Sequence, residues 1–226
     1  YNNSNDIDIE FEDGTIVKNV AYNTFKNGKI RNNNFNSVYG VGVVGDEEVN
    51  SKPYLFWRSM LMRCYSKGFK KKNKNYNNCK VCKEWMQLKN FKDWFDKNYY
   101  ELGNEKMVLD KDLFNEKSEY KIYSPTTCIF MPSKINSLFK KSVIDNDLPI
   151  GVGFDKKSKK YTSYGIENNK TKHLGYYDTP EEAFYAYKEF KESYIRRIAD
   201  EYKSKYPQFP QRLYEAMYSY QVEITD

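Results

Sequence analysis

The sequence predicts an α+β fold with three parts: a small N-terminal β-rich unit, a middle part of helices and strands, and a C-terminal sheet packed on one helix. Three observations support this. Residues 7–44 carry short apolar groups at strand period, residues 54–99 carry two stretches at helical period, and residues 149–177 carry three strand candidates before a well-marked helix start. We therefore expect three domains, at residues 1–46, 47–146 and 147–226.

The N-terminal unit is predicted from alternation and turn residues. Ile7, Ile9 and Phe11 lie on one face of an extended chain. The Asp-Gly pair at 13–14 and the Asn-Gly pair at 27–28 are typical of hairpin turns, so we expect an antiparallel unit.

The middle part begins with a predicted helix over residues 54–65, in which Trp57 and Cys64 share one face. The lysine- and asparagine-rich residues 67–78 are expected to form a loop. A second helix is predicted over residues 84–99, with its aromatic side chains in phase.

A pair of short strands is predicted next, at residues 108–109 and 128–130, on either side of a polar insert at 114–127. A short helix should follow over residues 132–141.

The C-terminal part has the pattern of a three-stranded sheet followed by a helix. The strand candidates are residues 149–154, 160–166 and 171–177. Thr179 suits an N-cap and Glu182 completes a capping box, so a helix should begin here. Residues 211–219 are expected to form a last short helix.

Basic charge is concentrated in one block. Residues 51–100 hold 13 Lys or Arg against 3 Asp or Glu, whereas residues 1–50 hold 4 against 8. The centre of the basic block is formed by Lys70, Lys71, Lys72 and Lys74. Aromatic residues interleave with these lysines, which favours nucleic-acid contact over a merely solvated loop.

The four cysteines are Cys64, Cys79, Cys82 and Cys128. Cys79 and Cys82 have the spacing of a zinc-ligand pair, and the other two thiols would complete a tetrahedral site. Strong zinc patterns contain two close pairs, however, and Cys64 and Cys128 are isolated. We favour ordinary packing of the thiols and keep zinc as the alternative.

Residues 57–139 resemble the phage HNH-type homing endonucleases. The matching motifs are Trp57-x-x-Met60-x-x-Arg63-Cys64, Val81-Cys82-x-Glu84-Trp85, Phe91-x-x-Trp94, Leu109-Asp110-Lys111-Asp112, Tyr123-x-Pro125-x-Thr127-Cys128-x-Phe130 and Ile135-Asn136. The resemblance implies a ββα-metal core, in which two strands and a helix hold one divalent cation.

The resemblance also implies roles for four residues. Asp110 corresponds to the metal-binding carboxylate and Asn136 to the ligand on the helix, so Mg²⁺ or Mn²⁺ would be the cofactor. Lys111 stands where the family has its general-base His, and Thr127 where it has the Asn that orients this base. A lysine is cationic at pH 7 unless burial lowers its pKa, so Lys111 suits a phosphate contact better than a base. The core is therefore expected to be degenerate.

Residues 149–200 resemble the AP2 DNA-binding domain. The matching motifs are Gly151-Val152, Lys160-Tyr161-x-Ser163, Leu174-Gly175-Tyr176-Tyr177-Asp178-Thr179 and Glu181-Glu182-Ala183-x-x-Ala186-Tyr187. That family lays three strands in the major groove of DNA and braces them with a helix. Strand alternation and the resemblance then give the expected DNA contacts: Lys157, Lys159, Lys160, Thr162, Tyr164, Thr171 and His173, the only histidine of the chain.

Three functions fit these patterns. We favour a phage-derived protein that binds double-stranded DNA and has lost nuclease activity. The alternatives are a metal-dependent DNA nickase or homing endonuclease, and an anti-defence protein that binds and inhibits a nucleic-acid enzyme of the host. The sequence contains no apolar run of about 18 residues, so we expect no membrane partner and a location in the cytoplasm, that of the host cell if a phage encodes the chain.

Overall fold

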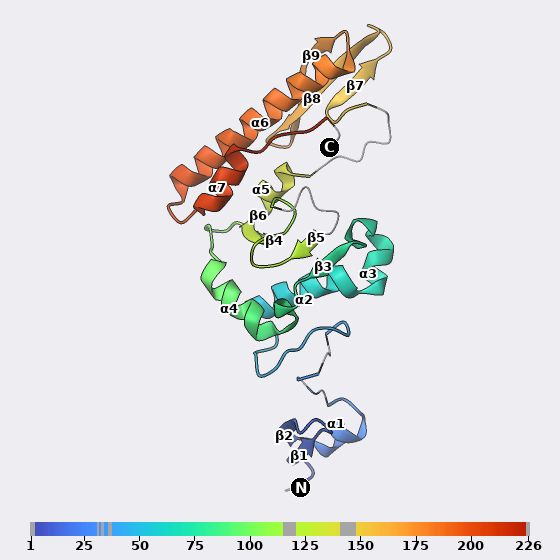
Figure 1. The fold of residues 1–226 in the computed structure, drawn as a ribbon, viewed down its shortest axis with the longest axis vertical. Helices are drawn as coiled ribbons and strands as arrows, with labels where there is room; N and C mark the ends of the chain where they lie inside the picture. Colours follow the sequence, from blue (N-terminus) through green and yellow to red (C-terminus); the bar gives the residue numbers. More distant parts are fainter. Residues whose placement is uncertain are drawn as a thin grey trace. The chain divides into compact units, whose positions relative to one another are not determined.

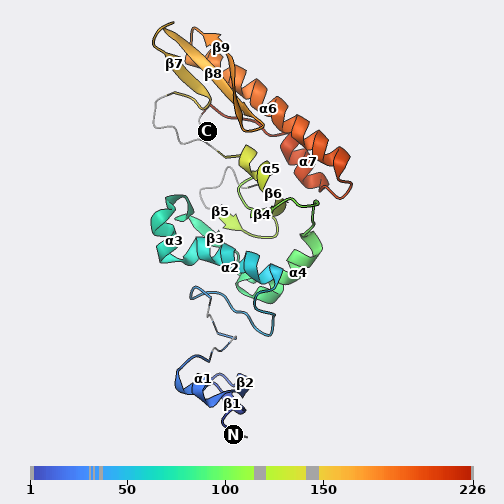
Figure 2. The same cartoon turned by 180° about the vertical axis from the view of Figure 1, so that it is seen from behind.

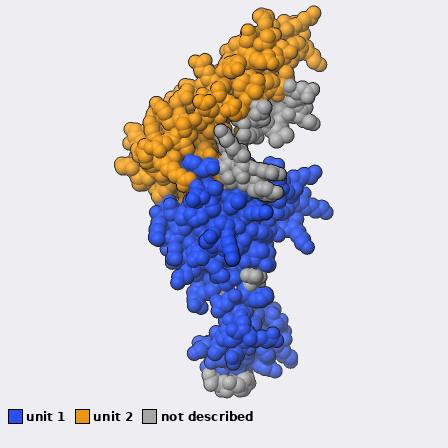
Figure 3. Space-filling view, viewed as in Figure 1, with its two compact units in different colours: residues 1–99, 114–128 blue, residues 100–113, 129–226 orange. Residues whose placement is uncertain are grey.

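The computed structural model describes residues 3–30, 32, 34–35, 38–114, 121–140 and 148–224 (Figure 1). The chain divides into two compact units: unit 1 is residues 1–99 with 114–128, and unit 2 is residues 100–113 with 129–226 (Figure 3). Helices and several small sheets occur together among the described residues, so the predicted α+β class is confirmed. The two units have other bounds than the predicted domains and divide the expected middle domain between them.

The N-terminal hairpin of unit 1 forms where the sequence predicts it. Strands β1 (Ile7–Glu10) and β2 (Ile16–Val20) pair antiparallel. The side chain of Asp13 stabilises the turn between them, because its Oδ1 accepts the backbone N–H of Thr15 at 3.0 Å.

The prediction of a second hairpin turn, at the Asn-Gly pair of residues 27–28, is wrong. Helix α1 (Tyr22–Lys26) precedes the Asn-Gly pair, and the pair ends this helix instead of joining two strands. Gly28 has a φ of +63° and donates its N–H to the carbonyl of Phe25 at 2.8 Å. A left-handed glycine directly after a helix is a common C-terminal cap, so the same dipeptide serves a different element.

The predicted loop at residues 67–78 also contains helical turns. After α2 (Lys52–Tyr65), helix α3 (Lys67–Lys72) and the 3₁₀ turn η1 (Lys74–Tyr76) follow at once. Ser66 starts α3, since its Oγ accepts the N–H of Phe69. Three lysines in the last turn of α3 lie at the negative end of the helix dipole, which stabilises this short helix.

Aromatic packing forms the core of unit 1. Helix α2 packs against α4 (Leu88–Asn98), which follows the 3₁₀ turn η2 (Glu84–Met86). Trp57 on α2 is fully buried, and its Nε1 donates to the carbonyl of Trp85 at 2.7 Å. The ring of Trp85 meets Phe91 edge-on at 5.0 Å. The aromatic residues of the predicted helices are thus core residues.

One strand of unit 1, at residues 121–123, lies inside the stretch 114–127 that was predicted as a polar insert. Strand β3 (Cys79–Val81) pairs in parallel with β5 (Lys121–Tyr123). A three-residue strand has too little alternation to be distinguished from a loop by sequence pattern.

Unit 2 begins with two strands and a helix packed together. Strand β4 (Met107–Asp110) pairs antiparallel with β6 (Ile129–Pro132), and α5 (Ser133–Leu138) packs on both. The order strand, strand, helix agrees with the predicted elements of this region.

The second part of unit 2 is an antiparallel sheet with the order β7 (Val152–Asp155), β8 (Lys160–Glu167) and β9 (Lys170–Tyr177). Helix α6 (Pro180–Lys205) lies along one face of this sheet (Figures 1 and 2). The predicted capping box is confirmed: Thr179 Oγ1 accepts the N–H of Glu182, and the Glu182 side chain accepts the N–H of Thr179.

Helix α7 (Gln211–Tyr218) forms where the sequence predicts a last short helix, and it packs against α6. Hydrogen bonds also tie the segment before β4 to the end of α6. Tyr202 donates its hydroxyl to Glu105 Oε1 at 3.1 Å, and Gln208 Nε2 donates to the carbonyl of Glu101 at 3.1 Å. The two parts of unit 2 are therefore joined by direct contacts.

None of the helices in the described part of the chain is long and apolar enough to span a membrane.

The close approach of α6 to the sheet gives a stability prediction. Gly151 has a φ of +79°, and a Cβ there would lie 2.3 Å from the ring of Tyr187 on α6. The Gly151→Ala substitution should therefore lower the free energy of unfolding by about 2–4 kcal/mol, through backbone strain and overpacking together. Urea denaturation followed by circular dichroism measures this change. Gly68→Ala is the matched control, because a Cβ at Gly68 would meet no atom within 4 Å; an equal loss in both variants would contradict the packing argument.

Candidate functional site

The carboxyl group of Asp110 lies at the end of β4 and stabilises the turn that follows. Its Oδ2 accepts the backbone N–H groups of Asp112 and Leu113, both at 2.9 Å. Burial raises the pKa of the Asp110 carboxyl, and the bond from Leu113 partly opposes this effect. One of its two oxygens thus has a structural task in the turn.

Lys111 is buried. The sequence favoured a phosphate contact for this lysine, and such a contact would need an exposed ammonium group. Only 3% of the residue is exposed, and its Nζ donates to Asp112 Oδ1 at 2.9 Å and Oδ2 at 2.7 Å. An ammonium group has no lone pair with which to take a proton from water. The position to which the resemblance assigns the general base therefore holds a buried lysine that is paired with a half-exposed carboxylate.

Thr127 and Asn136 lie in different units. Thr127 belongs to a turn of unit 1, where its Oγ1 donates to the carbonyl of Ile122 at 2.6 Å and accepts the N–H of Ser124 at 3.1 Å. Asn136 is half-buried on α5 in unit 2, the unit that also contains Asp110 and Lys111. Three of the four expected site residues thus share one strand-and-helix motif, and Thr127 is held by its own turn.

These residues do not form a good site for a divalent cation. Mg²⁺ and Mn²⁺ prefer several carboxylate oxygens and water. Asp110 has one oxygen engaged by two backbone N–H groups, and the buried ammonium of Lys111 lies in the next residue. No group of three or more His, Cys, Asp or Glu that could hold a metal occurs among the described residues. No reaction step through a metal ion follows from this arrangement.

The four cysteines all belong to unit 1. Cys64, Cys79 and Cys128 are buried, and the sulfur atoms of Cys64 and Cys79 lie 3.0 Å apart. Cys82 is half-buried, and burial raises the pKa of its thiol to about 11. Burial of Cys64, Cys79 and Cys128 fits the expected packing role, and zinc stays an untested alternative.

The lysine cluster predicted to contact nucleic acid lies on α3 and η1. Lys71, Lys72 and Lys74 are exposed at the surface of this segment. Lys70 is half-buried, and its Nζ donates to the carbonyl of Asn77 at 3.2 Å. The rings of Phe69 and Tyr76 pack edge-on at 5.5 Å in the same segment, so these aromatic groups brace the cluster.

The sheet of unit 2 has one covered and one open face. Ser163 and Gly165 on β8 face α6: Ser163 is fully buried, and a Cβ at Gly165 would lie 2.2 Å from the Phe190 ring. Tyr164 alternates with them on the other face and is 41% exposed. The predicted exposure of Tyr164, Thr171 and His173 on this open face is confirmed.

Thr162 is the exception, because it is buried although it lies on the open face. It pairs with Gly153 on β7 and Tyr176 on β9, in the middle of the sheet. A Cβ at Gly153 would lie 3.0 Å from Thr162 Oγ1 and 3.7 Å from a ring carbon of Tyr164. Bulky neighbours therefore shield the short side chain of Thr162, and the expectation that it is exposed for contact with DNA is wrong.

A β-bulge adds Tyr176 to the open face. Ser163 pairs with Gly175 and Tyr164 pairs with His173, so β9 has one extra residue, Leu174, between these two pairs. The ring of His173 consequently lies 5.2 Å from that of Tyr164 and 4.7 Å from that of Tyr176. If side chains simply alternated along β9, Tyr176 would lie on the covered face. In the sequence, the Leu-Gly pair at 174–175 is the only sign of an irregularity.

The lysines predicted to contact DNA from the β7–β8 region are all exposed. Lys157 and Lys159 lie in the turn, which Asp155 stabilises by accepting the N–H of Lys157 and the hydroxyl of Ser158. These bonds lower the pKa of the Asp155 carboxyl. Lys160 pairs with Asp178 at 3.0 Å, an exposed ion pair of small energetic value.

No protein-family model matches the chain, and it matches none of the curated proteins or solved structures with which it was compared.

The raised pKa of the Cys82 thiol gives a chemical prediction. Only the thiolate reacts with iodoacetamide, so labelling of Cys82 should be slow at pH 7 and speed up about tenfold per pH unit between about pH 8 and 10. Peptide mass spectrometry at several pH values measures the rate, and Cys82→Ser is the control that identifies the peptide. Rapid labelling that is independent of pH near neutrality would contradict the burial of this thiol.

Proposed function

We propose that the chain is a phage-derived DNA-binding protein, related to HNH homing endonucleases and lacking nuclease activity. An AP2-like sheet would face the duplex, and the lysines of α3 would contact the phosphate backbone. The open face of β8 and β9, with its aromatic cluster around His173, is the observation that carries this proposal.

The shape of this face suits the major groove of DNA. Strands β8 and β9 have eight residues each and form an antiparallel ribbon. A two-stranded ribbon fits the groove, which is about 12 Å wide. Helix α6 covers the opposite face and braces the backbone of the ribbon from behind.

The chemistry of the face suits both bases and phosphates. His173 and Tyr164 are exposed and carry hydrogen-bonding groups beside flat apolar rings. Lys157 and Lys159 at the β7–β8 turn have no ion-pair partner within the part of the chain that the structure describes. Phosphate contacts of such lysines supply affinity and orientation, whereas groups on the sheet would read base edges.

Lys111 supports the proposed absence of nuclease activity. Phosphodiester hydrolysis needs a group that accepts a proton and a metal that holds the phosphate charge. Here the expected base is a buried ammonium that is paired with Asp112, and Asp110 stabilises a turn. The strand-and-helix motif would thus keep its structural role while the proton-transfer machinery is missing.

DNA binding should show the salt dependence of phosphate contacts. We expect the affinity for duplex DNA to fall steeply with salt, and the Lys157→Ala/Lys159→Ala double variant to reduce the slope of log K against log[salt] by about 2. Fluorescence anisotropy at salt concentrations from about 50 to 200 mM measures the slope. The Lys26→Ala/Lys29→Ala variant, which removes two exposed lysines outside the basic block, should keep the slope. Affinity that is absent or independent of salt would refute the proposal.

A plasmid assay tests the nuclease alternative. Supercoiled plasmid should stay intact with the protein and Mg²⁺ or Mn²⁺ across several pH values, as it should with the Asp110→Ala variant. Gel electrophoresis separates nicked from supercoiled DNA. Nicking by the unmodified chain that Asp110→Ala abolishes would show a working metal-dependent enzyme, and the proposed loss of activity would then be wrong.

A further inference from the structure

The open face of the β8–β9 ribbon carries two exposed methyl-bearing side chains near its hairpin turn. Ile166 pairs with Thr171 across the ribbon, next to the pair of Tyr164 and His173 on the same face. Ile166 is 62% exposed, although isoleucine is among the residues most often buried in proteins. Thr171 is exposed as well. Paired side chains of an antiparallel ribbon have Cβ atoms about 4.5 to 5.5 Å apart, so Ile166 and Thr171 form one small apolar surface, the apolar pair.

Exposed rings continue this surface along the ribbon. Tyr164, two residues before Ile166 on β8, is 41% exposed, and Tyr176 is 54% exposed. The ring of His173 contacts the rings of both tyrosines. Single exposed apolar side chains are normal, whereas a contiguous patch marks an interaction site.

The groups that read a G·C base pair are missing from this face or engaged elsewhere. No arginine occurs in the described strands β7, β8 and β9. Lys160, which lies on the open face of β8, pairs with Asp178 at 3.0 Å. The carboxylate of Asp155 on β7 is bound by its own turn. Because guanine is read by Arg or Lys and cytosine by Asp or Glu, the face has little with which to select a G·C pair.

Helix α6 holds the hairpin turn beside the apolar pair. The backbone N–H of Asn168 donates to the hydroxyl of Tyr194 at 3.3 Å, and this hydroxyl donates to Asn168 Oδ1 at 3.4 Å. Arg197 forms an ion pair with Glu167, the last residue of β8. Tyr194 and Arg197 both belong to α6. The turn is thus tied to the helix behind the sheet, and the apolar pair stays on the open side.

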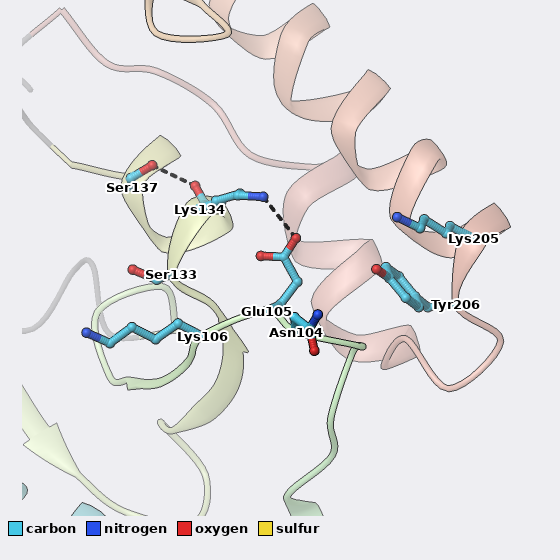
Figure 4. Close-up of a pocket in the computed structure, with 8 residues that line it drawn as sticks. All are labelled: Asn104, Glu105, Lys106, Ser133, Lys134, Ser137, Lys205 and Tyr206. Atoms are coloured by element: carbon cyan, nitrogen blue, oxygen red, sulfur yellow. Dashed lines mark hydrogen bonds and ion pairs between the residues drawn. The ribbon is translucent and has the colours of Figure 1, made fainter.

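A polar pocket elsewhere in unit 2 is less suited to contact nucleic acid. Residues before β4, on α5 and at the end of α6 line it (Figure 4). Lys134 and Glu105 pair at 3.1 Å, and the ammonium groups of Lys106 and Lys205 extend to opposite sides of this pair in Figure 4. The positive charges of the pocket do not converge on one phosphate, so the open face of the sheet is the better surface.

We propose that the apolar pair recognises the methyl group of thymine in the major groove, an inference that rests on the DNA-binding function proposed above. The C5-methyl group of thymine is the apolar feature among the base edges of that groove, and apolar side chains and the methyl group of threonine are its partners. The open face therefore favours A·T over G·C pairs. In this arrangement His173 and the two tyrosines supply hydrogen bonds beside the methyl contact.

Replacing thymine by uracil tests this contact, because uracil lacks only the methyl group. Competition anisotropy at low salt compares a short alternating adenine–thymine duplex with its adenine–uracil counterpart. The unmodified chain should bind the uracil duplex about fourfold more weakly, as expected for one methyl group left in water. The Ile166→Ala/Thr171→Ser variant removes the apolar pair and keeps a hydroxyl at position 171. It should bind the two duplexes with equal affinity.

Two control variants show whether the effect belongs to the apolar pair. Ile16→Ala removes another exposed isoleucine, on β2, and should keep the difference between the duplexes. Lys157→Ala/Lys159→Ala should weaken binding to both duplexes alike, because phosphate contacts carry no information on the base. Circular dichroism of each variant checks that the fold is retained.

The outcomes separate thymine recognition from DNA binding itself. Salt-dependent binding with equal affinity for the two duplexes overturns thymine recognition and leaves the DNA-binding proposal standing. A loss on uracil substitution that Ile166→Ala/Thr171→Ser retains also overturns it, since the methyl group would then act through another part of the complex. Absence of binding to any duplex overturns both proposals.

Discussion

The close packing of α6 on the three-stranded sheet is the constraint on which the rest of unit 2 depends. Where the sheet meets the helix its side chains are small, as at Ser163 and Gly165, and the rings of Tyr187 and Phe190 fill the space. This arrangement leaves room for the helix on one face of the sheet only. Tyr164 alternates with these small residues along β8 and is therefore exposed on the other face, where the β-bulge of β9 adds Tyr176.

In the strand-and-helix motif of β4, β6 and α5, structural contacts occupy groups to which the resemblance assigned chemical roles. The motif keeps its pairing and its packed helix. The polar groups around its first strand now bind one another: Asp110 holds a turn, and Lys111 holds Asp112. A buried ammonium is stabilised by such a carboxylate, and breaking the pair would leave an uncompensated charge. We infer that Lys111 has a structural role in the fold.

Long amphipathic helices and capped helix starts could be predicted from the sequence, because their signals are local. Helix α2 and the capping box at Thr179 lie where the pattern places them. Short elements could not be predicted. Strand β5 pairs with β3, which is distant in the sequence, and α3 begins at a serine cap in a stretch that otherwise has loop composition. For the site, exposure of Tyr164 and His173 followed from alternation, whereas the burial of Thr162 depended on its neighbours across the strands.

The sequence by itself determined the α+β class, the residue types available for chemistry and the segments that form the main helices and strands, since periodicity and caps act over a few residues. Only the tertiary structure decided which of those residues act together. The bulge at Leu174 brings Tyr176 beside His173, and the end of α6 brings the hydroxyl of Tyr202 to Glu105. The physical reason is that burial, register and convergence of charges arise from contacts between residues far apart in the chain, which no local pattern records.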